Sequence, residues 1–64
     1  MKTSPFYHLT FSNGVHVYYR YVEHRTRVVA VASSWPLTDD YLRAIPRHKW
    51  RPFDTGTHTF VDKH

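Results

Sequence analysis

Hydrophobic and polar residues alternate in two runs near the start of the chain, and the dipeptide Asn13-Gly14 separates the runs. Alternation with a period of two is typical of strands that bury one face and expose the other. Asn-Gly between two such runs is a strong turn signal. The pattern therefore predicts a β-hairpin with strands at residues 6–11 and 15–23.

The length of the hairpin loop decides which side chains share a face of the sheet. A two-residue loop would place Leu9 opposite Tyr18 and would mix the apolar side of one strand with the polar side of the other. A three-residue loop over 12–14, closed by Gly14 in the left-handed region, pairs Leu9 with Val17 instead. We therefore predict the three-residue loop.

A run rich in β-branched residues, 27–33, predicts a third strand. A three-residue connection over 24–26 would pair Tyr21 with Val29, whereas a four-residue connection would pair Tyr21 with Val28. We favour the first of these two registers.

The strongest helix signal begins at Thr38, a favourable N-cap that is followed by two aspartates suited to the first turn. Leu37 and Leu42 lie at the positions of a hydrophobic staple. Pro46 disfavours helical geometry in the residue before it, so the helix is expected to end after about two turns.

The remaining residues predict an ordered basic loop over 47–52, a turn over 53–56 and a short edge strand over 57–62. The predicted fold class is α+β, with a small antiparallel sheet (a three-stranded meander plus an edge strand) and one short helix in the order β-β-β-α-β. We expect a single domain over residues 1–64.

The helix needs one face of this sheet. The face that carries Val15, Val17, Tyr19 and Tyr21 is the natural choice because it is the more apolar one. We therefore expect the opposite face, with Tyr18 and its neighbours, to remain open to solvent.

The composition limits the classes of function. The 64 residues include no cysteine, which excludes disulfides and thiolate zinc sites. No apolar run approaches the ~20 residues of a membrane span, and the N-terminus does not resemble a signal peptide, so we expect a cytoplasmic protein with no membrane partner.

The net charge is +4 with histidine neutral, and the six histidines would add charge on acidification, which favours a polyanionic partner.

Two clusters of aromatic and cationic residues are candidate binding sites. The outward hairpin face interleaves rings with positive or ionisable groups, a combination that binds nucleic acid because bases stack at about 1–3 kcal/mol each while cations follow the backbone. The basic loop places a tryptophan among cations. The alternatives are that the helix or a second subunit covers the hairpin face, and that the tryptophan closes the core. The candidate residues are His16, Tyr18, Arg20, Arg47, Lys49, Trp50 and Arg51.

Catalysis and metal binding are not expected. His8 and His16 share a face, but as diagonal neighbours, and no carboxylate is placed to orient either ring. No HExxH motif, Cys/His pattern or phosphate-binding glycine loop occurs in the sequence. We predict no catalytic residue, no metal and no cofactor.

The sequence therefore predicts a non-enzymatic small basic binding protein that contacts nucleic acid through the sheet face and the basic loop. The alternative is a small regulator or inhibitor, of the kind encoded by mobile elements or viruses, that docks on an acidic surface of a larger host protein. A homodimer that joins edge strands is compatible with either function.

Overall fold

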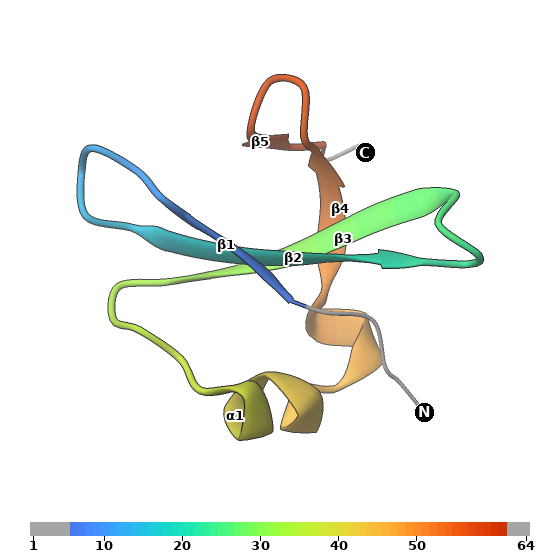
Figure 1. The fold of residues 1–64 in the computed structure, drawn as a ribbon, viewed down its shortest axis with the longest axis horizontal. Coiled ribbons are helices and arrows are strands. Elements are labelled where there is room, and N and C mark those ends of the chain that lie inside the picture. Colours follow the sequence, from blue (N-terminus) through green and yellow to red (C-terminus); the bar gives the residue numbers. More distant parts are fainter. Residues whose placement is uncertain (1–5, 62–64) are drawn as a thin grey trace.

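Five antiparallel strands lie side by side in chain order in the computed structural model, which describes residues 6–61 (Figure 1). The predicted α+β class and the order β-β-β-α-β are confirmed, and the sheet contains one strand more than the sequence predicted. The elements are β1 (Tyr7–Thr10), β2 (His16–Val22), β3 (Arg27–Ser33), α1 (Asp39–Ala44), the 3-10 turn η1 (Arg47–Lys49), β4 (Arg51–Asp54) and β5 (Thr59–Phe60).

The first hairpin has the predicted register, with Leu9 opposite Val17. The Phe11 N–H donates to the Val15 carbonyl at 2.9 Å, which closes a three-residue loop. Gly14 has a φ of +89°, in the region that glycine adopts without a steric penalty. The loop therefore forms as the sequence predicted.

The favoured register of the second hairpin is wrong. Tyr21 pairs with Val28, and the connection has four residues, 23–26. Three consecutive residues of this loop, Glu23, His24 and Arg25, have positive φ angles between 53° and 68°. Non-glycine residues rarely adopt this conformation, so it could not be predicted from the residue types of the loop.

This change of one residue in register alters which face of the sheet is apolar. Val29 and Val31 now lie on the same face as Tyr18, and the segment with Leu37 and Leu42 packs against them. Tyr18 is only 5% exposed. The expectation of an open Tyr18 face is therefore wrong, because the helix covers the face that carries the valines.

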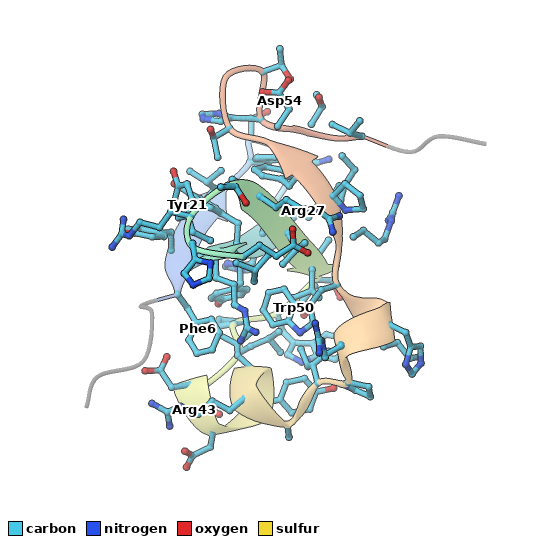
Figure 2. All side chains as sticks on the ribbon, turned by 90° about the vertical axis from the view of Figure 1, so that its right-hand side faces the viewer. Phe6, Tyr21, Arg27, Arg43, Trp50 and Asp54 are labelled. Carbon is cyan, nitrogen blue, oxygen red and sulfur yellow. The ribbon has the colours of Figure 1, made fainter. Side chains whose placement is uncertain are left out.

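The opposite face is covered by the last hairpin, which carries Asp54, whereas α1, which carries Arg43, lies on the other side of the meander (Figure 2). Phe53 of β4 is buried against Val17 and Ala30, and Phe60 of β5 packs on the same cluster. The predicted turn over 53–56 is wrong, because Arg51–Asp54 form β4. The predicted strand over 57–62 contains the shorter β5, and residue 62 lies outside the described part of the chain. Pro52 within β4 lacks a backbone donor, and proline is uncommon inside a strand, so the residues of β4 carry no clear strand signal.

The helix has the bounds that its signals predicted. The Thr38 hydroxyl accepts a hydrogen bond from the Tyr41 N–H at 3.2 Å, and α1 ends one residue before the C-cap Ile45. Leu42 is 1% exposed and anchors the helix to the sheet. Among residues 6–61, no helix has the length and apolar character needed to cross a membrane.

Candidate functional site

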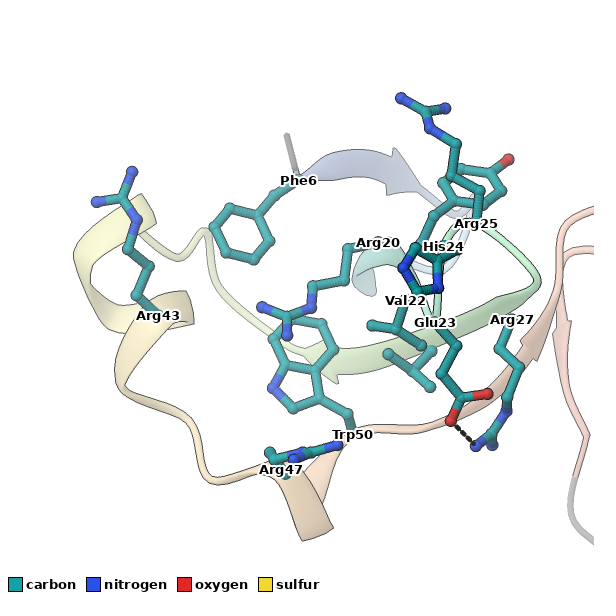
Figure 3. Close-up of a pocket in the computed structure, with 12 residues that line it drawn as sticks. Phe6, Arg20, Val22, Glu23, His24, Arg25, Arg27, Arg43, Arg47 and Trp50 are labelled. Carbon is teal, nitrogen blue, oxygen red and sulfur yellow. Dashed lines mark hydrogen bonds and ion pairs between the residues drawn. The ribbon is translucent and has the colours of Figure 1, made fainter. Parts of the chain in front are cut away.

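An open groove of about 990 Å³ lies between the β2–β3 loop on one side and α1 and η1 on the other (Figure 3). It collects five of the nine lysine and arginine residues of the chain. Arg25 and Arg27 lie at one side of the groove, and Arg43 and Arg47 lie at the other. We call this site the arginine groove; its basic residues are Arg20, His24, Arg25, Arg27, Arg43 and Arg47.

Arg20 projects from β2 into the groove and lies against two aromatic rings (Figure 3). Its Cζ atom is 5.1 Å from the centre of the Trp50 ring and 5.9 Å from that of Phe6. The two rings are nearly parallel, with centres 6.0 Å apart. A cation held against aromatic faces is stabilised by the ring quadrupoles, so the rings fix the position of this guanidinium.

The Nε atom of Arg20 is buried and has no hydrogen-bond partner within residues 6–61. Partial removal from water weakens the solvent screening of this charge. An anion in the groove would therefore be attracted more strongly by Arg20 than by an arginine that is fully surrounded by water.

Negative charge in the groove is limited to one described lining residue, Glu23. Its carboxylate accepts a hydrogen bond from Arg27 at 3.3 Å. Arg43 contacts Asp40 at 3.4 Å, but the Asp40 side chain is 96% exposed, so this pair is weak. The groove as a whole therefore retains an excess of positive charge.

The structure separates the seven residues that the sequence predicted as a binding site. Arg20, Arg47 and Trp50 meet in the arginine groove. Lys49 and Arg51 line a second groove, on the other side of η1.

Two of the predicted rings are removed from contact with a ligand. The Tyr18 hydroxyl accepts a hydrogen bond from the Leu37 N–H at 2.9 Å, which ties the sheet to the start of the helical segment. Trp50 is 9% exposed and belongs to the same core cluster, as the alternative interpretation of this residue held. Neither ring offers a free face on which a base could stack.

His16 contacts His8 rather than the arginine groove. His8 Nε2 and His16 Nδ1 are 2.9 Å apart, and the His8 ring stacks on Tyr18 with ring centres 4.4 Å apart. Within residues 6–61, no group of three or more histidine, cysteine or acidic side chains could hold a metal ion.

Sequence reasoning missed four of the six basic residues of the groove: His24, Arg25, Arg27 and Arg43. Arg25 and Arg27 enter the groove because the second hairpin has a four-residue loop. The predicted helix already placed Arg43 in its last turn, beside the basic loop. The signal that could have identified the arginines was their concentration at the start of the third strand, in the helix and in the basic loop.

The arrangement suits an extended anion. Arginine binds phosphate and carboxylate groups with pairs of parallel hydrogen bonds, and arginines on two sides of a groove can follow successive charges. Comparison with known protein families, with characterised proteins and with solved structures finds no match.

Proposed function

We propose that this protein binds the phosphate backbone of nucleic acid in the arginine groove. The observation that carries the proposal is the gathering of five arginines around one groove in which Glu23 is the sole described acidic residue. Neutralising phosphates releases condensed counterions, which provides affinity without reading the base sequence. We therefore expect binding with little sequence preference.

Burial of Tyr18 and Trp50 changes the mode of binding that the sequence predicted. Because base stacking needs free aromatic faces, the affinity should come mainly from charge. A single strand is expected to bind better than a duplex, since its backbone can bend to follow a groove on one side of a small domain.

The test is fluorescence anisotropy with a labelled oligothymidine of about 20 nucleotides and a duplex of the same length, across about 50–200 mM salt. The logarithm of affinity should fall linearly with the logarithm of salt concentration, by about 0.7 for each phosphate neutralised on a single strand. A flat salt dependence, or no binding at low salt, would refute the proposal.

Two neighbouring residues of η1 provide a matched pair of variants. Arg47 lines the arginine groove and Lys49 lines the other groove, and both are exposed. Arg47→Gln should reduce the salt slope by about 0.7, and Lys49→Gln should change it less. Equal effects would mean that net charge, and not this groove, determines binding.

A regulator or inhibitor that docks on an acidic protein surface would use the same arginines. Competition separates the two functions. If nucleic acid is the ligand, poly-glutamate at equal charge should displace the oligonucleotide poorly, because it lacks the phosphate geometry that arginine matches. Displacement at equal or lower concentration would favour the acidic protein.

A further inference from the structure

A second groove, of about 630 Å³, lies between the end of β3, the β3–α1 connection, α1 and η1. We infer that this groove binds an extended, acidic segment of a partner protein. The site is separate from the arginine groove and does not depend on the proposed nucleic-acid function. We call it the tryptophan groove; its lining includes Val31, Trp35, Leu37, Tyr41, Ile45 and Lys49.

Two large aromatic side chains of the tryptophan groove are exposed. Trp35 is 63% exposed and Tyr41 is 56% exposed. Tryptophan and tyrosine are the residues most enriched at the energetic centres of protein interfaces. Together they offer apolar surface that a partner side chain could cover.

The backbone of Trp35 is fixed. The Ser33 hydroxyl accepts a hydrogen bond from the Trp35 N–H at 3.2 Å and donates one to the Trp35 carbonyl at 2.8 Å. A side chain presented from an ordered backbone loses less conformational entropy on binding than one on a loose loop. The exposed indole is therefore preorganised for contact with a partner.

An unpaired strand edge borders the same groove. β3 extends to Ser33, but its pairing with β4 involves only Val29 and Ala30. In the described part of the chain, residues 31–33 therefore have a strand on the β2 side and none on the β4 side. An extended peptide can add to such an edge through main-chain hydrogen bonds.

The charge of the tryptophan groove indicates which kind of partner segment it binds. None of the described residues that line the tryptophan groove is acidic, and Lys49 and Arg51 lie along it. Arg51 also contacts the Phe60 ring, with Cζ 4.4 Å from its centre. An acidic residue next to an apolar anchor would therefore match this surface. The unpaired edge of β3 favours a peptide over a nucleic acid, because a nucleic acid has no main-chain amides to pair with a strand.

The probe is a phage-displayed library of random peptides, selected on the full chain with excess oligothymidine present to occupy the arginine groove. Selected peptides should combine an aromatic or aliphatic residue with a nearby acidic residue. Amide chemical shifts should change mainly at residues 31–35 and 41. Failure to enrich any peptide, or shifts confined to the arginine groove, would overturn the inference.

Variants then test the contacts. Trp35→Ala should lower peptide affinity about tenfold or more, as for an interface anchor, and leave oligothymidine affinity unchanged. Lys49→Glu should lower the affinity for an acidic peptide. A peptide whose acidic residue is replaced by the corresponding amide should bind Lys49→Glu and the unmodified protein with similar affinity. Unchanged peptide affinity in Trp35→Ala would overturn the inference, and Tyr41→Ala is a second variant if the first fails to fold.

Main-chain pairing is tested on the peptide itself. Alternate amides of an added strand point toward the edge, so N-methylation should abolish binding at one of two adjacent positions and be tolerated at the other. Equal tolerance at both positions would refute strand addition. A second copy of the chain is the other candidate occupant, and light scattering tests it. If the protein forms a dimer that Trp35→Ala dissociates, the groove binds a second copy of the chain and the inference is overturned.

Discussion

Replacement of Tyr18 by phenylalanine isolates one hydrogen bond between the sheet and the helical segment. The Tyr18 hydroxyl accepts the Leu37 N–H at 2.9 Å, and the ring is 5% exposed. The substitution keeps the ring and its packing. It leaves the Leu37 N–H, at a partly buried position, without its protein partner.

The expected loss follows from the energetics of an unsatisfied donor. Leaving a buried donor unpaired costs about 1–3 kcal/mol, and partial burial places this one at about 1–2 kcal/mol. In a domain of this size, 1 kcal/mol shifts the melting temperature by about 4–8 °C. We therefore expect Tyr18→Phe to melt about 4–16 °C below the unmodified protein.

The measurement is thermal unfolding followed by circular dichroism, together with urea unfolding to obtain the free energy. Tyr41→Phe is the matched control, because Tyr41 is 56% exposed and its hydroxyl is available to water. That variant should differ from the unmodified protein by less than about 0.5 kcal/mol. If the two variants melted at the same temperature, the hydrogen bond to Leu37 would not stabilise the fold as argued.

Substitutions at three further positions test other elements, each by the free energy of unfolding in urea. Gly14→Ala should destabilise by about 1 kcal/mol because φ is +89°, and Gly14→Asn should lose less, since asparagine tolerates this region. Thr38→Ala should lose about 0.5–2 kcal/mol through the missing cap, and Thr38→Ser should restore most of it. Leu42→Ala should lose about 2–5 kcal/mol, and a loss below 1 kcal/mol would mean that the helix does not anchor on this side chain.

Elements whose signals are local could be predicted from the sequence. The first loop could be predicted because only a three-residue loop, closed by Gly14, aligns the apolar residues of β1 with those of β2. Thr38 and Pro46 marked the two ends of α1 through capping and steric rules that act within one turn. The α+β class followed from these elements and from the β-branched third strand.

The second hairpin and the site depended on information that the sequence does not carry locally. The left-handed conformation of Glu23, His24 and Arg25 lengthened the loop by one residue, although glycine or asparagine would be the usual signal. The additional loop residue places Val29 and Val31 on the Tyr18 face, and the helix therefore packs on that face. Arg20 and Arg47, which the sequence predicted as binding residues, both line the arginine groove, but Arg25 and Arg43 became their neighbours only through the final register.

Both hydrophobic clusters draw on the same two central strands. β2 contributes Tyr18 to one cluster and Val17 to the other, and β3 contributes Val29 and Ala30 in the same way. Without the helix or without the last hairpin, the meander of β1, β2 and β3 would expose one apolar face to water. Few other residues of the chain could bury that surface instead. The helix and the last hairpin are thus energetically interdependent although they lie on opposite sides of the sheet, and weakening one should loosen the attachment of the other.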